Sequence, residues 1–92
     1  MNFFSGCVDY QEKITTEWCA DNIEIKNICN GTKEDCLAKG KAKCSADNTC
    51  YGVMYHPGGW SRNAKGVKFC TSTKLEPKGD WQAFLKCSGN FH

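Results

Sequence analysis

The sequence predicts a small, disulfide-rich α+β domain in which one central helix packs on a twisted antiparallel sheet. The chain has 92 residues and eight cysteines, and a chain this short buries too little surface to be comfortably stable without cross-links. Cys36, Gly40 and Cys44 recur with the spacing of one helical face. Apolar residues alternate around Val53 and again around Phe69, which is the pattern of paired strands.

The first half of the chain predicts two strands and the helix. An early strand is expected near residues 7–10, followed by a loop, and a second strand over residues 23–25, where isoleucine alternates with an outward glutamate. Asn30-Gly31 is a strong turn signal. The helix is expected over residues 33–46, with Thr32 as its N-cap and acidic residues in the first turn.

The second half predicts the rest of the sheet. Residues 50–56 and 66–71 read as a hairpin joined by a long, glycine-containing polar loop. Residues 72–79, which contain Pro77, are expected to form a loop, and residues 80–87 a closing strand. The closing strand should bring three apolar side chains to the core: Trp81, Phe84 and Leu85.

Alternation also predicts which way the hairpin side chains face. Val67 and Phe69 should share one face of their strand, with Lys68 and Cys70 on the other. Trp18 fits the core better than a ligand site.

The even number of cysteines indicates disulfides, and therefore a secreted, extracellular protein. Zinc is the rival explanation, but zinc sites favour closer cysteine pairs or a cysteine–histidine cluster. Here the tightest gap separates Cys44 from Cys50, and His56 and His92 are far apart. We therefore expect no metal and no cofactor.

Charge and hydropathy exclude other classes. The formal net charge is +2, from 12 basic and 10 acidic residues, which is too weak a bias to indicate nucleic acid or an acidic membrane surface. No apolar run approaches transmembrane length, so membrane insertion is not expected. The start of the chain is too short and uncharged for a signal peptide. We expect residues 1–92 to form one domain, either a mature chain or an excised module.

The central residues resemble PAN/apple domains. The resemblance covers about residues 29–87 and is carried by Glu34-Asp35-Cys36, by residues 43–55, by the late Cys70, and by residues 80–87. Such domains have a cysteine-bearing helix, a cysteine entering an aromatic strand, and a closing aromatic strand. Cys36 and Cys44 are about one helical turn further apart than is usual in that family, which keeps them on one face.

The resemblance implies a disulfide pattern. Its three disulfides are Cys44–Cys50, Cys36–Cys70 and Cys7–Cys87. This leaves Cys19–Cys29, a pair that the family pattern does not supply. Spacing alone proves none of these bonds, because eight cysteines allow many pairings.

The candidate binding surface is the loop after the first hairpin strand. Trp60 lies among polar residues and glycines where no core periodicity claims it, and an aromatic ring beside arginine is common at binding surfaces. The predicted binding residues are Tyr55, His56, Trp60, Arg62, Asn63 and Lys65. The alternatives are that Trp60 folds back over the hairpin, and that Tyr51 and Tyr55 pack inward.

Three other features have a functional and a plainer interpretation. No serine–histidine–aspartate set or paired-carboxylate motif stands out, and every cysteine has a plausible partner, so we expect no catalytic residue and no enzyme. Asn30-Gly31-Thr32 is an N-glycosylation sequon, although Thr32 also serves as a cap. Four lysines form either a heparin-like patch or, as Glu34 and Asp35 beside them favour, a solvated helix face: Lys33, Lys39, Lys41 and Lys43.

The sequence therefore predicts a secreted, non-catalytic recognition domain that binds an extracellular protein receptor or a glycan. The alternative is a diffusible signal, a pheromone-like or toxin-like ligand of a cell-surface receptor. Small disulfide-rich chains often serve that role.

Overall fold

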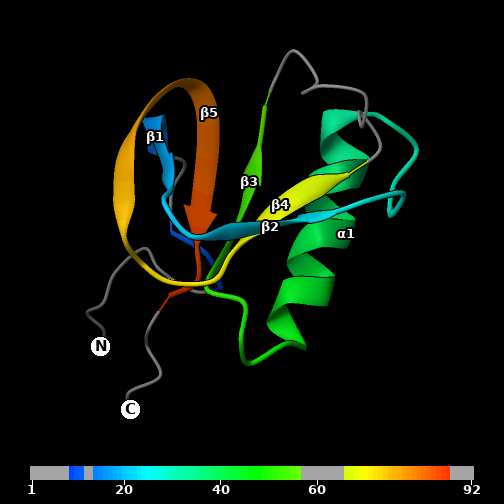
Figure 1. The fold of residues 1–92 in the computed structure, drawn as a ribbon. Helices are drawn as coiled ribbons and strands as arrows, with labels where there is room; N and C mark the ends of the chain where they lie inside the picture. The colour runs from blue at the N-terminus through cyan, green and yellow to red at the C-terminus, as the bar shows by residue number, and fades with distance from the viewer. Residues whose placement is uncertain (1–8, 12–13, 57–65, 88–92) are drawn as a thin grey trace, which may run out of the picture.

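The computed structural model describes residues 9–11, 14–56 and 66–87. In this part of the chain one helix packs against a five-stranded antiparallel sheet (Figure 1), with strand order β1-β5-β3-β4-β2. The elements are α1 (Lys33–Ser45), β1 (Ile14–Cys19), β2 (Asn22–Ile25), β3 (Gly52–Tyr55), β4 (Val67–Cys70) and β5 (Leu75–Leu85). The predicted disulfide-rich α+β class is confirmed.

Helix α1 forms where the sequence places it. Thr32 is the N-cap in an extended conformation, and its Oγ1 accepts a hydrogen bond of 3.2 Å from the backbone N–H of Asp35. The helix buries the face of Cys36, Gly40 and Cys44. At Gly40 a Cβ atom would lie 3.0 Å from a methyl group of Val67. Glycine thus allows α1 to approach the sheet closely, at some cost in helix propensity.

The two faces of the sheet bury separate clusters of hydrophobic side chains. The face toward α1 buries Cys36, Cys44, Cys50, Val53, Tyr55, Val67 and Phe69. The opposite face buries Cys19, Met54, Cys70, Trp81, Ala83 and Leu85. Val67 and Phe69 therefore lie opposite Cys70, as alternation predicts. Trp81 and Leu85 are buried as expected, whereas Phe84 is half-buried beneath the ammonium group of Lys41, 4.3 Å from its ring centroid.

A two-stranded β-ribbon, formed by β1 and the first half of β5, covers the face opposite α1 and is absent from the sequence-based prediction. The loop expected over residues 72–79 is wrong in its second part, because β5 begins at Leu75. Pro77 pairs with Glu17 of β1, and this half of β5 has no pairing with β3. A proline is tolerated there because one edge of the strand is open.

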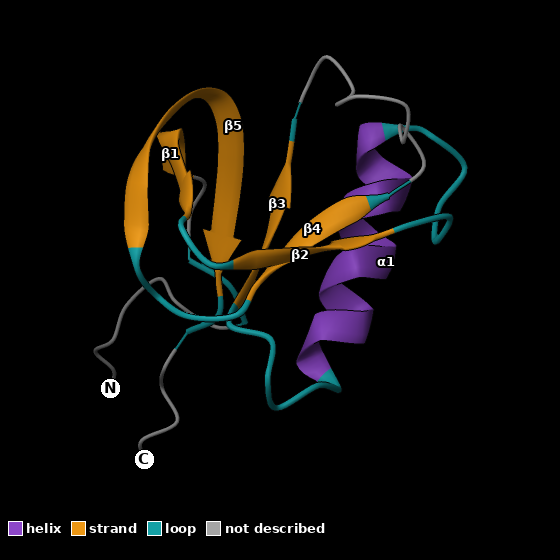
Figure 2. Cartoon of the chain, viewed as in Figure 1, coloured by secondary structure: helices purple, strands orange, loops and turns teal. Residues whose placement is uncertain are grey.

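Strand β1 was missed for a related reason. Its register on β5 shifts between Thr15 and Glu17, and Thr16 and Asp80 have positive φ angles of 67° and 65°. This irregularity interrupts the alternation that would reveal a strand. Figure 2 shows β5 arching beside β1 on the side of the sheet away from α1. Of the early strand expected at residues 7–10, Cys7 and Val8 lie outside the described residues, and Tyr10 forms an isolated bridge with Lys86.

Three disulfides cross-link the described residues, and two of the expected pairings are wrong: one implied by the resemblance and one left over from it. Cys44–Cys50 is present, as implied by the PAN/apple resemblance. The other two bonds replace the expected Cys36–Cys70 and Cys19–Cys29 pairs: they are Cys19–Cys70 and Cys29–Cys36. The reason is that Cys70 belongs to the face opposite α1, while Cys36 faces the sheet from the helix side. Cys87 is also disulfide-bonded, and Cys7, its expected partner, lies outside the described residues.

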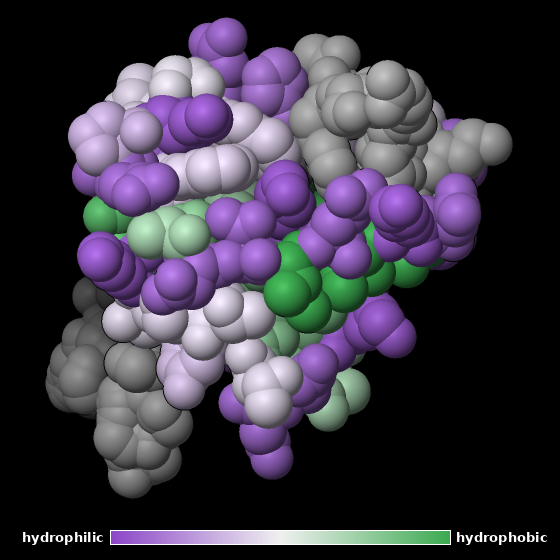
Figure 3. Space-filling model, viewed as in Figure 1, coloured by the Kyte–Doolittle hydropathy of each residue, from purple (hydrophilic) through white to green (hydrophobic). Residues whose placement is uncertain are grey.

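Hydrophilic residues predominate on the face shown in Figure 3, and a hydrophobic band runs along β2 beside α1. Ile23 of β2 is 50% exposed there, and Ile25 and Ile28 are half-buried against the α1-side cluster. The strand predicted at residues 23–25 is thus confirmed as β2, at one edge of the sheet.

Candidate functional site

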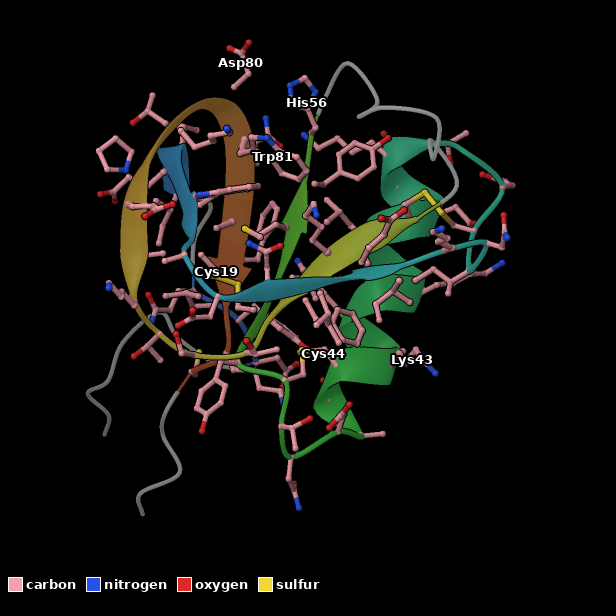
Figure 4. All side chains as sticks on the ribbon, in the orientation of Figure 1. Cys19, Lys43, Cys44, His56, Asp80 and Trp81 are labelled. Carbon is pink, nitrogen blue, oxygen red and sulfur yellow. A yellow bond between two sulfur atoms is a disulfide. The ribbon has the colours of Figure 1, made fainter. Side chains whose placement is uncertain are left out.

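Three aromatic rings form a row where β1, β3 and β5 meet. The ring centroids of Trp18 and Trp81 are 5.4 Å apart, and His56 meets Trp81 edge-on at 5.3 Å. Figure 4 shows His56 and Trp81 beside each other, with Asp80 extending outward beyond them. We call Trp18, Trp81 and His56 the aromatic row.

The sheet register brings the row together. Tyr55 of β3 pairs with Gln82 of β5, so His56 leaves β3 next to Trp81. Trp81 is 6% exposed and belongs to the cluster opposite α1. Trp18 comes from β1 and is half-buried against the same cluster. Trp81 therefore anchors the row, while Trp18 and His56 retain exposed surface.

Trp18 is held by a cross-strand carboxylate. Its indole N–H donates a 3.0 Å hydrogen bond to Oε1 of Glu76, the residue opposite it in the β1–β5 pairing. This contact satisfies the one polar atom of the side chain and fixes the orientation of the ring.

Two lysines flank the Trp18 ring. Nζ of Lys78 lies 4.8 Å from the ring centroid and Nζ of Lys68 lies 5.9 Å from it, both within the range of a cation–π interaction. Nζ of Lys68 also donates a hydrogen bond of 3.4 Å to Oδ1 of Asn22. The site thus combines aromatic surface with cationic donors and one carboxylate, which suits a ligand that stacks on a ring and forms hydrogen bonds.

The predicted binding residues divide into three groups. His56 belongs to the aromatic row. Tyr55 is only 4% exposed in the cluster facing α1, so its prediction as a binding residue is wrong and the packing alternative holds for it. The remaining four lie outside the described residues: Trp60, Arg62, Asn63 and Lys65. Tyr51, by contrast, is 44% exposed.

Sequence reasoning missed Trp18 as a surface residue. The available signal was the alternation of Glu76 and Lys78 around Pro77, which places two charged side chains on one face of a strand. This pattern identifies a site only when β1 is known to pair with β5, the strand that contains Glu76 and Lys78.

The lysines of helix α1 have separate contacts. Lys39 forms an ion pair of 3.3 Å with Asp35, and Lys41 lies over the rings of Tyr10 and Phe84. Lys43 is exposed on α1 (Figure 4). These three lysines thus have different local environments, which favours a solvated helix face over a polyanion site.

Two ionisable groups near the end of α1 have shifted pKa values. The carboxylate of Asp47 accepts hydrogen bonds from the side chain and backbone of Thr49, which lower its pKa below 3.8. Partial burial raises the pKa of the Tyr10 phenol above 10.0. Both groups stabilise turns and packing around Cys44–Cys50 rather than the aromatic row.

Within residues 9–11, 14–56 and 66–87 no cluster of three or more histidine, cysteine or acidic side chains is placed to bind a metal ion, and the cysteines there are disulfide-bonded. In the same ranges no helix is both long and apolar enough to span a bilayer. Comparison of the chain with protein-family models, curated proteins and solved structures finds no match.

Proposed function

We propose that this chain is a secreted, non-catalytic recognition domain that binds an extracellular glycan or protein through the aromatic row and its flanking charges. The observation that carries the proposal is the aromatic row, in which the rings of Trp18 and His56 each contact the ring of Trp81. A disulfide-bonded scaffold presents this row with lysine and glutamate at its border.

The scaffold supports an extracellular role. Three disulfides within the described residues of so short a chain are compatible with an oxidising compartment. The sequence resemblance to PAN/apple domains favours recognition over catalysis. The loop in which Trp60 and Arg62 are predicted to bind follows His56 directly in the sequence.

The chemistry of the row favours a ligand with a flat apolar face and an anionic or hydroxyl-rich edge. Trp18 offers ring surface for stacking, and Lys78 offers a cationic donor with its Nζ 4.8 Å from the ring centroid. Sugar rings and aromatic side chains both meet this description. Acidic sugars match it further, because they add a carboxylate or sulfate for the lysine.

The test uses the oxidised full chain, labelled with a fluorophore, on a glycan array and on fixed eukaryotic cells. Treating the cells with periodate or with protease beforehand distinguishes a glycan from a protein receptor. We expect saturable binding that His56→Ala or Lys78→Ala weakens about tenfold, equivalent to about 1.4 kcal/mol. Lys43→Ala removes an exposed lysine from the helix and serves as the matched control.

Equal binding by the row variants and the parent would reject the aromatic row as the binding surface. Trp60→Ala then tests the adjoining loop separately. If the chain binds to cells and also triggers a dose-dependent response in them, the alternative of a diffusible signal is favoured. Reduced and alkylated protein is the negative control for scaffold dependence.

A further inference from the structure

We infer that Asn30 is an N-glycosylation site, modified on Nδ2 when the chain passes through a eukaryotic secretory pathway. The inference rests on the proposed secretion and concerns a different part of the molecule from the aromatic row. Asn30-Gly31-Thr32 is an Asn-x-Thr sequon. It lies between Cys29, which is bonded to Cys36, and the start of α1.

The side chain of Asn30 is exposed and its two polar atoms have different environments. Oδ1 accepts hydrogen bonds from the backbone N–H of Thr32 at 2.9 Å and from Oγ1 of Thr32 at 3.0 Å. The backbone donor requires an oxygen at that position, which fixes the orientation of the amide. Among the described contacts, Nδ2 donates no hydrogen bond. The nucleophilic end of the amide is therefore the end that the fold leaves available.

Modification preserves the local structure. Nδ2 forms a bond to C1 of the first sugar, which is transferred from a lipid-diphosphate-linked oligosaccharide. The C1–oxygen bond to the diphosphate breaks, and Nδ2 loses one proton. Oδ1 takes no part in the new bond and keeps its contacts with Thr32. Oγ1 of Thr32 continues to accept the 3.2 Å hydrogen bond that caps α1.

The attachment point is also distant from the aromatic row. In Figure 1 the segment from β2 to α1 extends beyond the helix, whereas β1 and β5 lie on the other side of β3. Gly31 makes the turn into the helix with a φ of 104°. A glycan at Asn30 therefore extends from the helix side and leaves the aromatic row accessible.

The test is expression of the full chain behind a heterologous secretory leader in mammalian cells. Intact mass is measured before and after peptide-N-glycosidase treatment, and the tryptic peptide of residues 27–33 is sequenced by mass spectrometry. We expect a glycan that the enzyme removes, converting Asn30 to aspartate in that peptide. Cell-associated chain is analysed together with the medium, so poor secretion does not conceal the result.

Three variants separate glycosylation from helix capping. Thr32→Ser keeps both the sequon and the cap, and should remain glycosylated. Thr32→Asp keeps a cap acceptor but destroys the sequon, so it should be unmodified with a melting temperature close to that of the deglycosylated parent. Asn30→Gln should also be unmodified. Disulfide-bonded parent chain without a glycan overturns the inference. Binding by the aromatic row is measured on deglycosylated protein, so either proposal can fail without the other.

Discussion

Cys19 at the end of β1 is disulfide-bonded to Cys70 at the end of β4, with Cα atoms 5.4 Å apart. Both residues are fully buried. The backbone N–H of Cys19 also contacts Sδ of Met54 at 3.0 Å. The bond therefore fastens the β1–β5 ribbon over the sheet face opposite α1, and this ribbon carries Trp18 of the aromatic row.

Removing the Cys19–Cys70 disulfide should destabilise the domain more than removing the Cys29–Cys36 disulfide. Cys19–Cys70 closes a sequence separation of 51 and Cys29–Cys36 one of 7. The chain-entropy relation gives losses of about 4 and about 2.5 kcal/mol respectively. The paired alanine variants are compared by urea unfolding under non-reducing conditions. Equal losses, or a larger loss for Cys29–Cys36, would contradict the assigned role of the ribbon staple.

Gly52 allows β3 to approach β5 closely, so Gly52→Ala should be strongly destabilising. A Cβ atom there would lie 2.8 Å from the carbonyl oxygen of Phe84 and 3.0 Å from Cα of Leu85, and backbone atoms cannot move aside cheaply. We expect a loss of about 3 kcal/mol in the free energy of unfolding. Gly79→Ala is the control, because its Cβ meets no atom within 4 Å. That variant should change the free energy by less than about 0.5 kcal/mol.

The turn at Asp47 should make stability depend on pH in the acidic range. Its folded-state pKa is lowered below 3.8, chiefly by hydrogen bonds from Thr49. The ionised carboxylate therefore contributes stability above that value, and the contribution is lost as the pH falls through the folded-state pKa. Asp47→Ala should be less stable than the parent at neutral pH. The difference should shrink in urea titrations at about pH 2, and a constant difference would show that charge is not involved.

The Tyr10 phenol should make stability fall as the pH rises in the alkaline range. Its hydroxyl donates a 2.8 Å hydrogen bond to the carbonyl oxygen of Lys41, and burial raises its pKa above 10.0. The protonated phenol thus stabilises the fold below the unfolded-state pKa, and this stability is lost as the pH rises through the folded-state value. Tyr10→Phe should cost about 1 kcal/mol at neutral pH. Ultraviolet titration should show that the variant lacks one late-ionising tyrosine.

The helix and the hairpin were predictable because their signals are local. Thr32, the acidic first turn and the Cys36–Gly40–Cys44 spacing lie within consecutive turns of one helix. Alternation likewise assigns Val67 and Phe69 to one face of β4. These patterns depend on the immediate neighbours in the chain and survive folding unchanged.

The ribbon and its disulfide were not predictable, because both depend on residues distant in sequence. Glu17 meets Pro77 only through the β1–β5 register, and a strand with a register shift loses its period of two. Disulfide partners are decided by which face of the sheet each cysteine occupies. Alternation placed Cys70 opposite Phe69, and this was a better guide to its partner than the pattern implied by resemblance.

The aromatic row was predictable only in part, because its residues come from strands that are distant in sequence. His56 follows an evident strand, but Trp18 reaches Trp81 only when β1 pairs with β5. Trp18 also has Glu76 as its hydrogen-bond partner from that pairing. A surface assembled from three strands requires the topology before its residues can be grouped.

The most direct measurement is a tryptic disulfide map of the native chain, digested without reduction. Cleavage after lysine and arginine separates the relevant cysteines into different peptides, except that residues 44–62 hold both Cys44 and Cys50. We expect residues 14–26 joined to 69–74, and residues 27–33 joined to 34–39. Residues 34–39 joined to 69–74 would instead show a Cys36–Cys70 bond. That result would contradict the ribbon over the second face and, with it, the surface proposed for recognition.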